Sequence, residues 1–195
     1  MKAFTRTTGR VAVLDRADVD TDQIIPKQFL KRIERTGYGE FLFHDWMRDP
    51  DFELRRPEAE DAVVLIAGRN FGCGSSREHA AWALDDYGFR VVLAPSFGDI
   101  FRTNAVKTGL APIVLGEAEL SALKNAVARR NELAVDLEAQ VIAHSQGLRV
   151  RFDFDPFERE TLLEGLDDVA RTLQRVDEIA AYEAKQPARF ELDAV

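Results

Sequence analysis

Apolar residues along this chain fall into short β-branched runs separated by stretches with helical spacing. The runs Val63–Ala67, Arg90–Pro95 and Ala111–Leu115 are short and almost continuous, which is typical of strands that are buried on both faces of a sheet. Gly9–Leu14 has the same character and is expected to form a strand before them. These four runs are the expected central strands of the fold.

Helical periodicity fills the segments between these strands. The first helix is expected to end near Tyr87, because Gly88 suits the left-handed position that closes a helix. Ile100–Lys107 and Glu117–Arg130 are the next two helices, and the second has one clearly apolar face. Strands that alternate with helices predict an α/β fold with a largely parallel sheet.

The pattern changes in the last third of the chain. A small β element is expected from three short strand candidates, Leu133–Asp136, Val141–His144 and Leu148–Phe154. Pro156–Ala184 turns helical, and the tail from Pro187 is expected to be an interface arm or disordered. We therefore expect one domain over residues 1–155 and a helical C-terminal extension over residues 156–195 that packs on it.

The loop after Val63–Ala67 carries the most informative chemistry. Glycines recur in it up to Gly74, and Ser75 followed three residues later by Glu78 predicts a capping box, or at least a helix cap at the serine. A strand that ends in glycines at a helix N-terminus offers free backbone N–H groups and a positive dipole end to an anion. Arg77 in the first turn is disfavoured by that dipole, and a ligand carboxylate or phosphate would explain it.

Other chemistries fit this loop less well. A Walker loop needs Gly-Lys-Ser/Thr where the chain has Gly74-Ser75-Ser76, and a dinucleotide fingerprint needs glycine at the position of Arg77. Cys73 could be a nucleophile whose pKa is lowered near the helix N-terminus, but a small side chain packed in a tight loop is the simpler interpretation. Ser76 and Arg77 suit a carboxylate, and Ser75 would sit among N–H groups that can stabilise its alkoxide.

Composition narrows the class of protein further. The 195 residues carry a net charge of −8, which argues against a nucleic-acid partner. No apolar run is long enough to cross a bilayer, and the first six residues lack a signal-peptide core, so we expect a cytoplasmic protein with no membrane partner. Cys73 is the only cysteine, and one thiol cannot hold an iron–sulfur cluster, so another chain must supply any cluster that the chemistry needs.

An acidic loop near the N-terminus has the spacing of a calcium site without its key positions. Asp18, Asp20 and Asp22 match the opening of such a loop, but Gln23 stands where the loop needs glycine and Phe29 where it needs glutamate. We therefore expect no metal ligands in this chain.

Several long motifs agree in order with the aconitase superfamily. Its swivelling domain and N-terminal motif are resembled by Gly74–Ala80, Ala94–Asn104, Gly109–Pro112 and Asp18–Pro26. Similarity to the small subunits of bacterial 3-isopropylmalate dehydratases extends to Lys27–Arg32, Asp155–Glu160, Leu163–Asp168 and Ala180–Glu183. The resemblance covers nearly the whole chain and implies a single swivelling β/β/α domain of the aconitase type with a mainly parallel central sheet.

The resemblance also implies a reaction and a partner. Members of this family are hydro-lyases of leucine biosynthesis that act only with a large subunit, which carries a [4Fe-4S] cluster on three cysteines. The substrate is a hydroxy-dicarboxylate, 2-isopropylmalate, which is converted through 2-isopropylmaleate to 3-isopropylmalate. The small subunit itself binds no cluster, which is consistent with the single cysteine of this chain.

Family roles, carried over to matching positions, assign the glycine-rich loop. Ser75 would be the base that takes the proton from carbon, while Ser76 and Arg77, next to Gly74, would hold a substrate carboxylate. Thr21 and Asp22 match the N-terminal motif and would line the cleft.

The region after the N-terminal motif would set specificity. The family places a second arginine there, and either Lys31 or Arg32 could take its place. The segment expected to meet the variable side group of the substrate consists of Thr36, Gly37, Tyr38 and Gly39. An isopropyl group needs an apolar wall, which an aromatic residue such as Tyr38 would suit.

Three other interpretations remain open at this point. The chain could serve a sister dehydratase that acts on homoaconitate or on methylmalate and citraconate. It could be a non-catalytic assembly subunit whose loop only orders an interface. It could also be a stand-alone thiol enzyme that uses Cys73.

Overall fold

The computed structural model describes residues 1–31 and 36–185. The chain divides into two units, Met1–Gly165 and Leu166–Val195, and helix α5 (Pro156–Glu164) belongs to the first. The N–H of Phe4 donates to the carbonyl of Leu162 in this helix at 2.8 Å, and the Leu162 side chain is fully buried. The expected boundary after residue 155 therefore lies one helix earlier than the division between the units.

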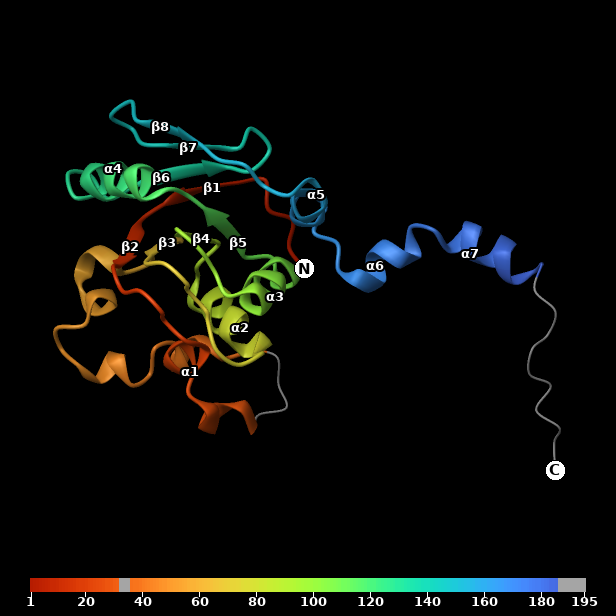
Figure 1. The fold of residues 1–195 in the computed structure, drawn as a ribbon, viewed down its shortest axis with the longest axis horizontal. Helices are drawn as coiled ribbons and strands as arrows, with labels where there is room; N and C mark the ends of the chain where they lie inside the picture. Colours follow the sequence, from red (N-terminus) through yellow and green to blue (C-terminus); the bar gives the residue numbers. More distant parts are fainter. Residues whose placement is uncertain (32–35, 186–195) are drawn as a thin grey trace. The chain divides into compact units, whose positions relative to one another are not determined.

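The centre of the first unit is a four-stranded parallel sheet with the order β2-β3-β4-β5 (Figure 1). Its strands are β2 (Val11–Leu14), β3 (Val64–Ala67), β4 (Val91–Ala94) and β5 (Ala111–Val114). The expected strands and their parallel arrangement are confirmed. The last three strands are apolar on both faces because both faces of the sheet are covered.

A second, antiparallel sheet has the order β1-β6-β7-β8. Its strands are β1 (Arg6–Gly9), β6 (Leu133–Asp136), β7 (Val141–Ala143) and β8 (Arg149–Arg151). The expected β element is thus confirmed and gains a strand from the N-terminus. The run Gly9–Leu14, predicted as one strand, is shared between the sheets, since Gly9 pairs with Leu133 while Val11 pairs with Val64.

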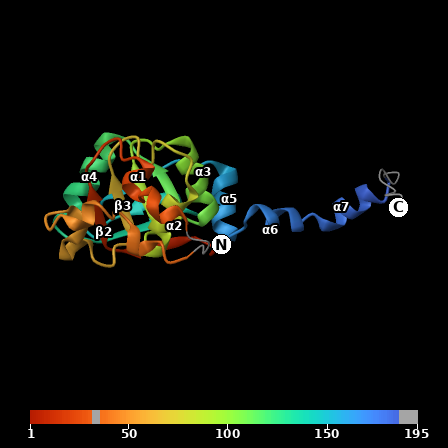
Figure 2. The same ribbon diagram turned by 90° about the horizontal axis from the view of Figure 1, so that it is seen from below.

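Helices cover one face of the parallel sheet, and the antiparallel sheet covers the other (Figures 1 and 2). The first face meets α1 (Thr21–Ile24), α2 (Glu78–Tyr87) and α3 (Asp99–Thr108). The second face meets α4 (Glu117–Val127) together with the antiparallel strands. This order of layers confirms the β/β/α architecture.

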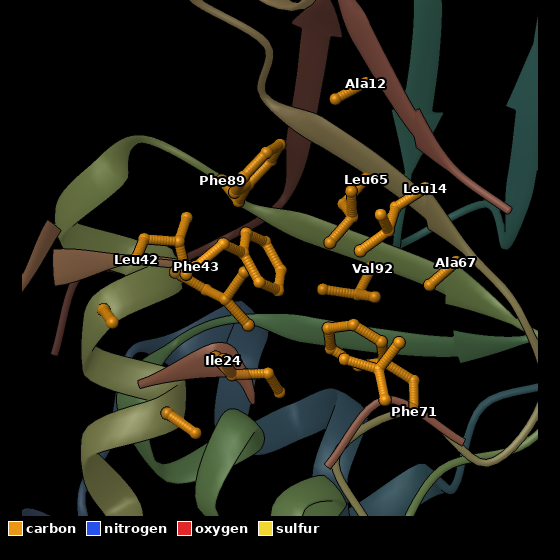
Figure 3. Close-up of a cluster of buried hydrophobic side chains, with 14 of the residues drawn as sticks. Ala12, Leu14, Ile24, Leu42, Phe43, Leu65, Ala67, Phe71, Phe89 and Val92 are labelled. Carbon is orange, nitrogen blue, oxygen red and sulfur yellow. The ribbon is translucent and has the colours of Figure 1, made fainter. Parts of the chain in front are cut away.

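Two hydrophobic clusters, one on each face, hold these layers together. Successive residues of β3 alternate between them: Leu65 enters the helical cluster, while Val64 and Ile66 enter the other. The helical cluster also contains Ile24 from α1 and Phe43 from the connection after it (Figure 3). The short helix α1 is therefore fixed to the sheet by its own apolar residue.

Glycines end the helices as expected. Gly88 has a φ of 119° after α2, which confirms that boundary, and Gly109 has a φ of 100° after α3. The helical segment expected over Pro156–Ala184 is broken at Gly165 and again before Val176, so the second unit holds α6 (Asp168–Leu173) and α7 (Val176–Glu183). Within the described ranges, no helix is long and apolar enough to cross a membrane.

Candidate functional site

The loop that follows β3 reaches helix α2 later than its sequence suggests. Helix α2 begins at Glu78, and its N-cap residue is Arg77, whose backbone is extended with φ −136° and ψ 108°. No side chain caps this helix end. The predicted capping box between Ser75 and Glu78 is therefore wrong, because both serines lie in the loop before the helix.

The tip of this loop presents free polar groups at the surface. Gly74, Ser75 and Ser76 are exposed. Over residues 1–31 and 36–185, the two serine hydroxyls have no hydrogen-bond partner, and neither do the backbone N–H groups from Gly74 to Arg77. Free N–H groups beside the N-terminus of a ten-residue helix are the arrangement that an anion site requires. Anion binding at this tip stays a prediction.

Arg77 already faces an anion of the chain itself. Its Nη2 donates to Oδ2 of Asp22 at 2.9 Å, and its Nη1 donates to Oδ1 of the same carboxylate. This hydrogen bonding is the main cause that lowers the pKa of Asp22 below its usual value. The expectation that Arg77 lies in the first helical turn is corrected, because Arg77 precedes the helix. Its partner within the described chain is Asp22, and binding of a ligand anion by Arg77 stays a prediction.

Thr21 lies beneath the loop instead of lining an open cleft. Its side chain is 2% exposed. The Oγ1 hydroxyl donates to the carbonyl of Ser75 at 3.0 Å, and the N–H donates to the carbonyl of Cys73 at 2.9 Å. The structure thus brings Thr21, Asp22, Ser75 and Arg77 together, although the first two come from a different part of the chain.

Helix α1 carries the capping box that the loop lacks. The N–H of Gln23 donates to Oδ1 of Asp20 at 2.8 Å, and the N–H of Asp20 donates to Oε1 of Gln23 at 2.9 Å. The sequence does contain this signal, because an aspartate three residues before a glutamine and next to apolar residues is a helix start. When the same aspartates are compared with a calcium loop, this helix-start signal is easily overlooked.

Cys73 is in the wrong electrostatic setting for a thiolate. Burial, followed by the nearby carboxylates of Asp20 and Asp18, raises the pKa of its thiol. A helix N-terminus would lower that pKa, and the other contributions prevail here. The side chain therefore fits the simpler interpretation of a small residue in a tight loop.

The predicted specificity segment is anchored to helix α2 by Tyr38. This side chain is fully buried, and its ring lies 5.2 Å from that of His79 and 5.8 Å from that of Trp82. Its backbone N–H donates to the carboxylate of Asp86 at 2.8 Å. Tyr38 holds the segment in place and does not form an open apolar wall.

The neighbours of Tyr38 are more accessible. Thr36 and Gly37 are exposed, while Gly39 lies against α2, where an added Cβ would come within 2.8 Å of the Asp86 backbone. Of the two candidates for the second basic residue, Lys31 is exposed at the end of a short 3-10 helix. Arg32 lies outside the described residues.

The described residues hold no metal site, but a cavity of about 430 Å³ lies at the predicted specificity segment, where Gly37 and Gly39 line it together with Asp86 and Tyr87 of α2. In the described part of the chain, no group of three or more His, Cys, Asp or Glu side chains could hold a metal ion. A cavity of about 610 Å³ lies beside β2 and α4, and none of the predicted site residues lines it.

Gly72 ties the loop to the core and is the basis of a stability prediction. Its φ is +74°, and an added Cβ would lie 2.2 Å from Cγ of Phe101 in α3. Gly72→Ala is expected to lower the free energy of unfolding by about 2–4 kcal/mol, since backbone strain and overpacking act together. Urea unfolding followed by circular dichroism measures this change.

Gly147→Ala is the matched control for this prediction. Gly147 has a φ of +94°, but no atom lies within 4 Å of an added Cβ. Only backbone strain then remains, and a loss of about 1 kcal/mol is expected. Equal losses in the two variants would show that packing against Phe101 is not what requires glycine at position 72.

Two family profiles match this chain. One is described as the aconitase C-terminal domain and matches residues 1–118. The other is described as the C-terminal domain of the 3-isopropylmalate dehydratase small subunit and matches residues 168–190. The first profile includes every residue of the candidate site.

Curated relatives match over nearly the full length. A 3-isopropylmalate dehydratase small subunit from Geobacillus kaustophilus is 52% identical over 196 residues, covering 97% of this chain and 100% of the relative. One from Rhodopirellula baltica is 54% identical over 192 residues, covering 94% and 98%. A crystal structure of a Methanocaldococcus jannaschii 3-isopropylmalate dehydratase matches with a TM-score of 0.67 at 29% identity, covering 91% of this chain and 99% of that chain.

Proposed function

Since this chain belongs to the family of 3-isopropylmalate dehydratase small subunits, we propose that its loop Gly74–Arg77 carries the base and a carboxylate site of that enzyme. The chain is the small subunit of a hydro-lyase in leucine biosynthesis and works with a large subunit. The observation that supports the assignment is the exposed row of free hydroxyl and N–H groups next to the Arg77 guanidinium.

Ser75 is the proposed base. Its alkoxide takes the proton from the carbon next to the hydroxyl-bearing carbon, and the released electron pair forms the double bond of 2-isopropylmaleate. The hydroxyl group leaves from the neighbouring carbon, takes up one proton from solvent and departs as water, and Ser75 releases the proton it took to solvent, so that one molecule of water is lost overall. Addition of water in the opposite sense gives 3-isopropylmalate. Serine is a weak acid, so the free N–H groups beside Ser75 have to stabilise its alkoxide.

Ser76 and Arg77 are the proposed carboxylate site. The Ser76 hydroxyl can donate to one oxygen of this carboxylate. Arg77 adds a positive charge and a planar set of donors that match a carboxylate. A dicarboxylate held at one end in this way presents its reacting carbons to Ser75.

The [4Fe-4S] cluster belongs to the large subunit in this proposal. The donor set of this chain does not fit a cluster, because Cys73 is its only cysteine and an iron–sulfur cluster needs several thiolates. When bound in the partner, the cluster supplies Lewis-acid assistance to the departing hydroxyl group. This chain provides the proton transfer and the carboxylate site.

The segment Thr36–Gly39 is proposed to face the isopropyl group of the substrate. The buried Tyr38 ring fixes this segment on α2, so that Thr36 and Gly37 can be presented to a ligand. Selection of an apolar side group over a carboxylate then follows, because none of these four residues carries a positive charge. The cytoplasmic location expected from the sequence stays a prediction of the same proposal.

A reconstitution assay tests the proposed function. The chain is purified anaerobically with a cluster-bearing large subunit, and the absorbance of 2-isopropylmaleate is followed with each chain alone and with both. Turnover that needs both chains supports the proposal. A complex that rejects 2-isopropylmalate but accepts homoaconitate or methylmalate would move the substrate to a sister dehydratase, and a folded complex without any turnover would favour an assembly subunit.

A further inference from the structure

We propose that the segment Val19–Asp22 is a template that fixes the reactive loop, which consists of residues 72–77, and that Thr21 and Asp22 act as positioning residues and not as substrate ligands. This inference rests on the proposed function of Ser75 and Arg77. It replaces the expectation that Thr21 and Asp22 line the cleft and bind substrate directly.

The hydrogen bonds between Val19–Asp22 and the reactive loop follow the same order along both segments. The N–H of Gly72 donates to the carbonyl of Val19 at 2.7 Å, and the N–H of Thr21 donates to the carbonyl of Cys73 at 2.9 Å. Further along, the Thr21 hydroxyl reaches the carbonyl of Ser75 at 3.0 Å. The Asp22 carboxylate then takes the Arg77 guanidinium. Each step along the template thus holds a later position of the loop.

The template itself is firmly held. Its helix α1 is capped at Asp20 by a complete capping box, and Ile24 and Ile25 are fully buried in the helical cluster. The carbonyl of Ile24 also accepts the N–H of Phe43 at 2.8 Å. Hydrogen bonds to this well-packed segment restrict the movement of the reactive loop, as a site that positions reacting atoms requires.

Charge shows why Asp22 acts through Arg77. Pairing with Arg77 lowers the pKa of Asp22, so the carboxylate stays ionised and can only accept hydrogen bonds. A substrate carboxylate also only accepts, and two such groups repel each other. Asp22 is therefore a poor ligand for a substrate carboxylate, whereas its two carboxylate oxygens accept hydrogen bonds from Arg77.

The way in which Arg77 is held leaves room for a second carboxylate. Asp22 occupies the edge formed by Nη1 and Nη2. The Nε–H of Arg77 has no partner in the described part of the chain. A guanidinium offers a second pair of parallel donors on the side that carries Nε, and this side can bind another carboxylate. The Arg77 side chain is 14% exposed and that of Asp22 is 52% exposed, so the arginine is the more restrained partner.

Thr21 positions Ser75, the proposed base. Its buried hydroxyl holds the carbonyl of Ser75, and through it the peptide that carries the proposed base. The Ser75 hydroxyl makes no hydrogen bond within the described chain. The template therefore fixes the backbone of the base without occupying its reactive oxygen.

The two positions predict different kinetic defects in the reconstituted enzyme. Asp22→Asn frees the guanidinium, and we expect KM for isopropylmalate to rise by about tenfold with kcat within about twofold of wild type. Thr21→Val removes the bond to Ser75, and we expect kcat to fall by at least about tenfold with little change in KM. Thr21→Ser keeps the hydroxyl and should restore kcat.

Controls separate positioning from loss of structure. Asp45→Asn removes the same charge from an exposed surface pair with Arg48 and should leave both constants unchanged. In an Arg77→Lys background, Asp22→Asn should have little further effect on KM, because Asp22 influences substrate binding only by holding the Arg77 guanidinium, which this background lacks. Equal effects in both backgrounds, or a lower KM in Asp22→Asn, would overturn the inference.

A readout without turnover keeps this inference separate from the proposed function. In NMR spectra of the small subunit, the Arg77 Nε–H should give a sharp signal in wild type and a broadened or lost one in Asp22→Asn. If wild type turns over isopropylmalate and the variants match it, the template fails while the proposed function stands. If the complex is inactive but the Arg77 signal depends on Asp22, the proposed function fails and the template stands.

Discussion

Replacing Ser75 with alanine is expected to lower kcat of the assembled enzyme by about 10²–10⁴-fold, the range that a positioned general base contributes. KM for isopropylmalate should change little, because the proposed carboxylate donors at Ser76 and Arg77 remain. Steady-state kinetics of the purified two-chain complex, with formation of 2-isopropylmaleate followed by absorbance, measures both constants.

The structure indicates that the Ser75→Ala substitution should leave the fold unchanged. Ser75 is exposed, and its hydroxyl makes no hydrogen bond within residues 1–31 and 36–185, so truncation leaves no buried group without a partner. The backbone carbonyl that accepts from Thr21 is unchanged. Ser76→Ala is the matched control one residue away, where the larger effect should fall on KM. Full activity of Ser75→Ala in an assembled complex would show that another group takes the proton.

The core of the fold could be predicted because its signals are local. Runs such as Val91–Ala94 are continuous and β-branched, and glycine at position 88 needs no distant partner to end a helix. The division of Gly9–Leu14 between two sheets could not be predicted in this way. It depends on the pairing of Gly9 with Leu133, more than a hundred residues away.

The site shows the same limit at a smaller scale. The placement of Arg77 near a helix N-terminus led us to expect a ligand anion, and the local sequence could not reveal that the chain's own Asp22 pairs with this arginine. Likewise, Tyr38 is an aromatic residue of the kind expected in a pocket wall. Only its ring contacts with His79 and Trp82 show that it anchors the specificity segment to α2. A residue type indicates the chemistry, whereas the partner is fixed by the topology of the chain.

Replacing Arg77 with glutamine is expected to raise KM for isopropylmalate by about 10²-fold or more, with a smaller decrease in kcat. The variant loses a charged donor pair, and each hydrogen bond to a charged group is worth about 1.5–3 kcal/mol. Arg77→Lys retains the charge but not the planar fork, so its KM should lie between those of wild type and Arg77→Gln. Initial rates over a wide range of substrate concentration separate the two constants.

Arg16→Gln is the matched control for the Arg77 series. Arg16 also binds a carboxylate through two nitrogens, Nε and Nη2, with Glu53 as its partner, but it contacts no residue of the reactive loop through these bonds. Its loss should leave KM unchanged. In Arg77→Gln, by contrast, the half-exposed Asp22 regains water, so the fold should survive and the defect should be one of binding. A normal KM in Arg77→Gln would mean that the substrate carboxylate is held elsewhere, and that the pair with Asp22 is only a structural link between α1 and the loop.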